Sequence, residues 1–302
     1  MEHIVEKIKA LKKEKNAVIL AHCYQPVEID LVADYVGDSL RLSQVAAETD
    51  ADIIVFAGVF FMAQTAKLLS PNKKVLLPQL NAGCRMADMI SFNQLKEFKA
   101  MHPDIPTVCY VNSTAEVKSE CDMCCTSSNA VKIVKSMNQD KILFVPDTYL
   151  GKWVEKQLGN VEVITYPGFC PTHLQIRPKD IEDARLAHPN ALVLAHPECH
   201  MSVSAIADYV GSTTGIMKFA KENPNKSFII ATEQGVVDRL KRDLPNKEII
   251  PVKENIVCPN MKMTSLEDIL EVLETEKNEI TVESDIAEKA VKCIDRMLEV
   301  SK

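Results

Sequence analysis

A threefold internal repeat is the feature of this sequence that most restricts its fold. Residues Asn16–His22 read NAVILAH, and the similar NALVLAH follows 174 positions later at Asn190–His196. The same offset relates ADYVG at Ala33–Gly37 to ADYVG at Ala207–Gly211. A weaker third copy, TVCYVN at Thr107–Asn112, lies 88 residues after the matching part of the first copy and 86 before that of the last. Self-similarity at a fixed period predicts three copies of one structural unit.

Each copy contains further short apolar runs that fit a second and a third β-strand. Runs rich in Val, Ile and Leu that alternate with helical patterns are typical of parallel sheets covered by helices on both faces. We therefore expect an α/β protein of three homologous three-layer αβα sandwich units with parallel sheets, arranged around a pseudo-threefold axis. A doubly wound two-domain protein is the alternative. The runs are Ile53–Ala57, Ile142–Val145 and Phe228–Ala231, then Val75–Leu77, Val161–Ile164 and Ile249–Val252.

The repeat divides the chain into units at residues 16–101, 102–188 and 189–270. An N-terminal helix at 1–15 and the C-terminal segment 271–302 are expected to pack on the first unit. Ile286, Ala290 and Met297 form an apolar stripe at helical spacing, which predicts a packed helix in that segment. Cys293 belongs to the same stripe and is interpreted as a core residue.

The composition argues against several classes of function. Of the 302 residues, 46% are hydrophobic and 25% charged, which is ordinary for a globular protein, and the net charge of −7 argues against a nucleic-acid or membrane surface. The sequence shows neither a signal-peptide pattern nor an apolar run that could cross a membrane, so a cytoplasmic protein is expected. Its ten cysteines then indicate packing or metal binding rather than disulfides, because that compartment keeps thiols reduced.

Polar or aromatic residues end the first strand of each unit in pairs spaced two apart. Residues i and i+2 of an extended strand share a face, so each pair can point toward the same axis. Ligands of parallel α/β units bind beyond the carboxyl ends of the strands, which makes these residues candidates for a site. The pairs are His22 with Tyr24, Tyr110 with Asn112, and His196 with Glu198.

Three hydroxyl residues recur in register as well. Ser39, Ser127 and Thr213 stand 88 and 86 residues apart, near the starts of helical segments. Hydroxyl groups and free backbone N–H groups at such places suit carboxylate or phosphate oxygens. Helix capping alone is the alternative, but three hydroxyls in register favour a shared binding site.

Three cysteines recur in the same way. Cys84, Cys170 and Cys258 are separated by 86 and 88 residues, and each follows the third strand of its unit. Threefold symmetry would bring their thiols together as a metal site. Because a structural zinc site normally has a fourth protein ligand and none repeats here, an iron–sulfur cluster with one open iron is favoured.

Cys121, Cys124 and Cys125 have a metal-like spacing but no counterparts in the other units. They align with a part of the repeat that we expect to be helical, so they are interpreted as packing thiols, with a redox role as the alternative. The cysteines within or beside the strand-end pairs are expected to point away from the axis and are interpreted as structural: Cys23, Cys109 and Cys199.

Longer motifs carry a family resemblance. They read AHCYQ at 21–25, GDS at 37–39, VFAGV at 55–59, FMAQTAK at 61–67, AGC at 82–84, YVNSTAE at 110–116 and HPEC at 196–199, followed by Ser212-Thr213, Cys258 and Met261-Lys262. Over nearly the whole chain they resemble the quinolinate synthase family, also called quinolinate synthetase A, the [4Fe–4S] enzymes of NAD biosynthesis.

The resemblance implies a transferase reaction in which iminoaspartate condenses with dihydroxyacetone phosphate to give quinolinate, phosphate and water. It also implies a functional link to an enzyme that makes iminoaspartate from aspartate. Cys84, Cys170 and Cys258 would hold the cluster, and its open iron would act as a Lewis acid.

Candidate roles for the remaining residues combine the resemblance with chemistry. Tyr24 with His22, and Glu198 with His196, are the expected acid–base groups. No arginine is required to hold the anionic substrates, because neutral donors and helix N-termini suffice. The expected substrate-binding residues are His22, Ser39, Tyr110, Asn112, Ser127, His173, His196, Glu198 and Thr213.

The sequence departs from the family pattern at Cys23, Phe60, Gln64 and Gln79, where the family commonly has other polar or acidic residues. Two further functions stay open from the residues alone. One is another [4Fe–4S] dehydratase that acts on a single hydroxy acid. The other is a non-catalytic cluster-binding or metabolite-binding protein, for which Glu198→Gln would leave ligand affinity intact.

Overall fold

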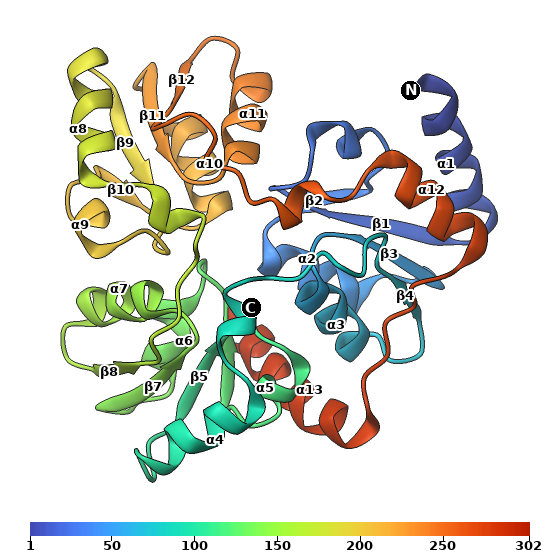
Figure 1. Cartoon of the computed structure of the whole chain (residues 1–302), viewed down its shortest axis with the longest axis horizontal. Coiled ribbons are helices and arrows are strands. Elements are labelled where there is room, and N and C mark those ends of the chain that lie inside the picture. The colour runs from blue at the N-terminus through green and yellow to red at the C-terminus, as the bar shows by residue number, and fades with distance from the viewer.

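Three parallel sheets of four strands form the framework of the computed structural model, which describes residues 1–302 (Figure 1). The first sheet contains β1 (Ala17–His22), β2 (Tyr35–Gly37), β3 (Ile53–Ala57) and β4 (Lys74–Leu76). The second contains β5 (Thr107–Tyr110), β6 (Met123–Cys125), β7 (Lys141–Val145) and β8 (Glu162–Thr165). The third contains β9 (Leu192–Ala195), β10 (Tyr209–Val210), β11 (Ser227–Ala231) and β12 (Glu248–Pro251).

The three sheets share one topology, which confirms the expected α/β class with three αβα units. Their strand orders are β2-β1-β3-β4, β6-β5-β7-β8 and β10-β9-β11-β12, and every strand pair is parallel. The short edge strands β2, β6 and β10 were not expected. They occupy the part of the repeat that was predicted to be helical, because runs of two or three extended residues carry no periodic signal.

Helices cover both faces of each sheet. They are α1 (Glu2–Glu14), α2 (Ser39–Glu48), α3 (Phe60–Leu69), α4 (Phe92–Ala100), α5 (Ala115–Lys118), α6 (Ala130–Ser136), α7 (Thr148–Leu158), α8 (Pro178–Ala187), α9 (Met201–Ser204), α10 (Thr213–Glu222), α11 (Gln234–Asp243), α12 (Leu266–Thr275) and α13 (Ser284–Ser301). Short 3-10 helices occupy Val27–Leu31, Ala87–Met89, His173–Gln175 and Asn260–Lys262. None of the helices has the length and apolarity needed to span a membrane.

The burial of β1 explains why the strands read as continuous apolar runs. Val18 and Leu20 belong to the core shared with α2 and α3, whereas Ile19 and Ala21 belong to a separate core that contains residues of α1 and α12. Successive side chains of a strand point to opposite faces, so a strand covered on both faces buries every residue. The same alternation recurs in β9, where Leu194 belongs to one core and its neighbours Val193 and Ala195 belong to another.

The C-terminal helices pack differently from the sequence expectation, which placed all of segment 271–302 on the first unit. Helix α12 does lie against α1 and β3 of that unit. Helix α13 instead packs mainly on α5, β6 and α6 of the second unit, with a smaller contact to α3 of the first (Figure 1). Its buried residues complete a core of 45 residues that runs through both units.

Candidate active site

The units meet at a central cavity. Its wall is formed by strand ends, by the starts of helices and by the loops that follow β4, β8 and β12. Cys23, Cys109 and Cys199 do not border it, in keeping with their interpretation as structural residues. Every residue that the sequence predicts for the site lies on its wall: His22, Tyr24, Ser39, Cys84, Tyr110, Asn112, Ser127, Cys170, His173, His196, Glu198, Thr213 and Cys258.

His22 and His196 show that the repeat extends to individual hydrogen bonds. The backbone N–H of Tyr24 donates to Nδ1 of His22 over 3.1 Å, and that of Glu198 donates to Nδ1 of His196 over 3.3 Å. Because Nδ1 is an acceptor in both rings, each neutral imidazole carries its proton on Nε2. The local backbone therefore fixes one tautomer at two equivalent strand ends.

Burial also fixes the charge of these two histidines. It is the main reason that the pKa of His22 falls to about 3, and the charges of Arg239 and Lys262 act in the same direction. Burial likewise lowers the pKa of His196 to about 3 despite the opposing charge of Glu198. Both rings are thus neutral at physiological pH and present an N–H donor rather than a titrating base.

Glu198 is the centre of a buried hydrogen-bond network and is only 4% exposed. Its Oε1 accepts a 2.6 Å hydrogen bond from the hydroxyl of Tyr110, and its Oε2 lies 2.9 Å from Nδ1 of His173. Burial alone would raise the pKa of Glu198, but His196, His173 and the Tyr110 hydrogen bond outweigh it and hold the pKa below its ordinary value. Glu198 is therefore an ionised carboxylate inside the protein.

A second chain of contacts joins the first unit to the third. The hydroxyl of Tyr24 lies 3.2 Å from Oγ1 of Thr232 and accepts a 3.2 Å hydrogen bond from Thr213. Thr232 lies 2.8 Å from Nε2 of His173. Burial and the charge of Glu198 raise the pKa of Tyr24 well above its ordinary value. Its phenol therefore stays protonated and can donate.

The three repeated hydroxyl residues border the cavity next to helix N-termini. Ser39 is the first residue of α2 and Thr213 the first of α10, while Ser127 precedes α6 in a turn. Asp38 connects the neighbouring residues, since its carboxylate accepts from Ser128 over 3.1 Å and from Thr214 over 2.5 Å. One carboxylate thus joins all three units beside the repeated hydroxyls.

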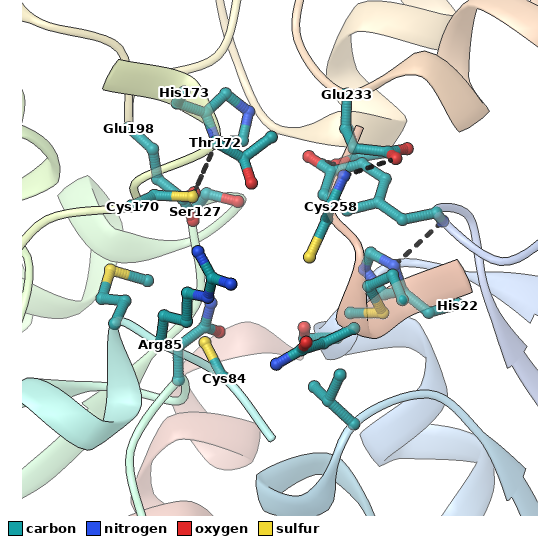
Figure 2. Close-up of a pocket in the computed structure, with 18 of the residues that line it drawn as sticks. His22, Cys84, Arg85, Ser127, Cys170, Thr172, His173, Glu198, Glu233 and Cys258 are labelled. Atoms are coloured by element: carbon teal, nitrogen blue, oxygen red, sulfur yellow. Dashed lines mark hydrogen bonds and ion pairs between the residues drawn. The ribbon is translucent and has the colours of Figure 1, made fainter. Parts of the chain in front are cut away.

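Cys84, Cys170 and Cys258 project toward a shared space in the cavity (Figure 2). Each stands in a loop just before a short 3-10 helix, so the repeat also holds in the local backbone. Burial raises the pKa of all three thiols, that of Cys84 to about 12. These are free thiols without a disulfide partner, and they are the only cysteines on the cavity wall.

A second group of cysteines lies away from the cavity, inside the second unit. Sγ of Cys109, Cys124 and Cys293 are 3.2–3.7 Å apart, and this group can hold a metal centre. Cys124 and Cys125 belong to strand β6 rather than to the helix that the sequence predicted. The interpretation of Cys293 as a core residue agrees with its 1% exposure.

Arg85 and Glu233 of the cavity wall, and Thr232 in contact with Tyr24 and His173, were not predicted from the sequence. Arg85 is the only Lys or Arg on the cavity wall, and its side chain extends inward from the loop of Cys84 (Figure 2). Glu233 is buried and accepts from the backbone N–H of Cys258 over 3.1 Å and from Lys262. Thr232 precedes Glu233 directly after β11. The position of Thr232 at a strand end was the available signal, whereas nothing in the repeat marks Arg85.

Comparison with known proteins decides the family. The family described as "Quinolinate synthetase A protein" matches residues 6–299. The chain belongs to this family. It is 51% identical to a quinolinate synthase of Alkaliphilus metalliredigens, over 99% of this chain and 98% of that protein. Quinolinate synthases of Dehalococcoides mccartyi and Caldicellulosiruptor bescii are 51% and 48% identical, each over 99% of both chains.

Membership in the quinolinate synthetase A family confirms the resemblance drawn from the motifs and identifies the chain as an enzyme of the quinolinate synthase type. Small-molecule substrates and a role in NAD biosynthesis follow from it. Family membership also supports the [4Fe–4S] cofactor expected from the sequence.

Proposed function

We propose that this protein condenses iminoaspartate with dihydroxyacetone phosphate to form quinolinate, releasing phosphate and water. The observation that carries the proposal is the convergence on one cavity of three thiols, one from each unit, with an ionised carboxylate and protonated phenols. Family membership supplies the reaction type, and the cavity supplies groups for each part of it.

Cys84, Cys170 and Cys258 are the proposed ligands of a [4Fe–4S] cluster. Thiolates are the ligands of such clusters, and three of them leave one iron without a protein sulfur. The raised pKa values describe thiols without metal, and ligation replaces each proton by iron. When bound, the cluster supplies a Lewis acid for an oxygen of the substrate.

The anionic groups of the two substrates find donors around the cavity. Ser39, Ser127 and Thr213 lie where helix N-termini and hydroxyl groups hold carboxylate or phosphate oxygens. Arg85 adds the only Lys or Arg side chain on the wall, and its planar guanidinium group can donate two hydrogen bonds to a phosphate. We propose that it binds the phosphate, although the sequence alone led us to expect that neutral donors would suffice.

Asn112 and Tyr110 are proposed to orient the substrate. Oδ1 of Asn112 is buried on the cavity side of the second unit and has no hydrogen-bond partner within the protein. A buried acceptor without a partner costs free energy, so a donor group of the substrate is its natural complement. Tyr110 orients Glu198 through its hydrogen bond and so sets the direction in which the carboxylate points.

Proton transfers are assigned from the protonation states. Glu198 is ionised and is the proposed base, whereas Tyr24 keeps its proton and is the proposed acid. His22 and His196 are neutral and donate hydrogen bonds through Nε2, which suits the stabilisation of developing negative charge on oxygen. His173 connects Glu198 to Thr232 and holds the network in place.

The proposed setting is the cytoplasm, with no nucleic-acid or membrane partner, because the chain is acidic overall and has no membrane-spanning helix. Iminoaspartate is an imine and hydrolyses in water. We therefore propose a functional link to an enzyme that produces it from aspartate close to the time of use.

The test combines cluster analysis with a product assay on protein purified without oxygen. Iron, sulfide and quinolinate formation would be measured for wild type, Cys84→Ala, Cys170→Ala and Cys258→Ala, with iminoaspartate generated in the assay. Cys125→Ala is the matched control because Cys125 is buried but lies outside the cavity. We expect about four irons per wild-type chain, with cluster and product lost in the three variants and kept in the control.

Two outcomes would contradict this function. A cluster that survives all three substitutions would show that other cysteines bind it. Wild type that has the cluster but dehydrates a single hydroxy acid, with no product from the two proposed substrates, would favour the dehydratase alternative.

A further inference from the structure

The cysteine group of the second unit is assembled from elements that are distant in sequence. Cys109 on β5 and Cys124 on β6 are direct partners in the parallel register, and their Sγ atoms lie 3.2 Å apart. Cys293 on α13 reaches the same point, with its Sγ 3.7 Å from Cys109 and 3.2 Å from Cys124. All three side chains are buried. The contact of α13 with the sheet is therefore centred on a triangle of sulfurs.

Cys121 supplies a fourth sulfur at the edge of this triangle. It stands three residues before Cys124, and its Sγ donates to the carbonyl oxygen of Val117 over 3.2 Å. Cys121 and Cys124 are separated by two residues, the spacing of cysteine pairs in structural zinc sites. Three thiols from two strands and a helix thus meet at one point, and Cys121, in the loop before β6, is the candidate for a fourth ligand.

The sulfur spacing fits a single ion better than a cluster. Zinc–sulfur bonds of about 2.3 Å in a tetrahedron place the sulfurs about 3.8 Å apart, close to the 3.2–3.7 Å found among the three buried thiols. In a [4Fe–4S] cluster each cysteine binds a different iron, so ligand sulfurs stand farther apart. The central cavity does not reach this group.

Lys118 provides an independent indication of negative charge at this point. Its side chain is completely buried, and Nζ donates to the carbonyl oxygens of Val111 and Ser113 but pairs with no carboxylate. A buried ammonium group without a counter-ion is costly. Burial raises the pKa of Cys124, and the charge of Lys118 opposes this rise and also favours the thiolate of Cys109, so Lys118 lies near the sulfurs. A zinc ion with four thiolates carries a net charge of about −2 and would balance this lysine.

We propose that Cys109, Cys121, Cys124 and Cys293 bind one zinc ion, which fixes helix α13 to the sheet of the second unit. The four thiols lose their protons to solvent as the Zn–S bonds form, and zinc undergoes no redox change. The site is structural, because four protein ligands leave no position for a substrate. It is distinct from the iron–sulfur centre of the proposed function and does not rest on it.

Metal analysis tests the proposal on the full-length protein. Wild type, Cys124→Ala and Cys293→Ala would be produced with added zinc, purified without chelator or oxygen, and analysed for zinc, iron and sulfide. We expect about one zinc per wild-type chain, lost in both variants and kept in Cys125→Ala. The triple variant Cys84→Ala/Cys170→Ala/Cys258→Ala should lose iron but keep zinc, so the two centres can be scored separately.

A measurement on wild type alone guards against variants that fail to fold. Protein produced with cobalt in place of zinc should show the intense visible and near-ultraviolet absorption of tetrahedral cobalt–thiolate bonds. Absence of both zinc and this absorption from folded wild type would overturn the proposal. So would zinc that disappears with the triple variant but survives Cys124→Ala and Cys293→Ala, or a Cys109–Cys124 disulfide, seen as a mass about 2 Da lower.

Discussion

Tyr110 donates a 2.6 Å hydrogen bond to Oε1 of Glu198, and this contact joins the ends of β5 and β9 across the boundary between the second and third units. Both side chains are almost fully buried. A carboxylate in such surroundings is ionised only if donors compensate for lost hydration. The protonation state of the proposed base therefore depends on a phenol from another unit.

The substitution Tyr110→Phe should raise the pKa of Glu198, because it removes one donor to the charged form while burial remains. In wild type the pKa of Glu198 lies below its ordinary value, so Glu198 loses its charge, and with it its contribution to kcat, only in strong acid. In the variant the acid limb of kcat against pH should move to higher pH, with a lower plateau. Tyr149→Phe, a half-exposed tyrosine of α7 outside the cavity, serves as control. An unchanged acid limb in Tyr110→Phe would contradict this assignment.

The buried histidines should make the protein sensitive to mild acid. The folded-state pKa of His22 and His196 is about 3, below the ordinary value of 6.5, so the unfolded chain binds more protons between these values. Stability should fall by about 1.4 kcal/mol per pH unit for each ring as the pH drops below about 6. Urea unfolding at several pH values would measure the slope. His22→Gln should reduce it, whereas the exposed His3→Gln should not, and equal slopes in all three proteins would refute the argument.

Arg85→Ala should weaken binding of dihydroxyacetone phosphate more than it slows turnover. A charged hydrogen bond to phosphate contributes about 1.5–3 kcal/mol, so KM for this substrate should rise roughly ten- to a hundredfold. Arg85→Lys should recover part of the loss, since it restores charge but not the planar fork. Arg185→Ala, which removes a surface ion pair with Asp208, should leave KM unchanged. A loss confined to kcat would assign Arg85 a different role.

Asp38→Asn should loosen the contact between the three units. The carboxylate accepts hydrogen bonds from Arg41, Ser128 and Thr214, and an amide cannot accept all of them. We expect a loss of about 1–3 kcal/mol in the free energy of unfolding, together with weaker substrate binding because Ser39 and Thr213 lie beside these contacts. Asp34→Asn, at a surface pair with Lys12, tests whether any loss of negative charge has this effect.

The fold and the residues that line the cavity could be predicted because a sequence repeat implies structurally equivalent units. Once three strands match in register, residues at equal offsets must lie at equivalent places, and this is why Cys84, Cys170 and Cys258 were identified without a structure.

The features that the sequence did not predict are those outside the repeat. Arg85 occupies a loop position with no equivalent basic residue in the other units. The approach of Cys293 to Cys109 spans 184 residues and depends on how α13 packs, which no periodic pattern encodes. Strand β6 is too short to show a period, so the cysteines on it were assigned to a helix. Hydrogen bonds such as that from Tyr110 to Glu198 depend on side-chain directions that only the packed structure fixes.

The packing of α13 has a consequence for the order of folding during synthesis. The buried residues of the two cores of the third unit all lie between 176 and 256, so these cores can form as soon as that stretch has left the ribosome. The core shared by the first and second units also needs Ala290, Ile294 and Met297 of α13. The unit translated third should therefore be the first to complete its core. The core shared by the first and second units stays incomplete until α13 has been synthesised.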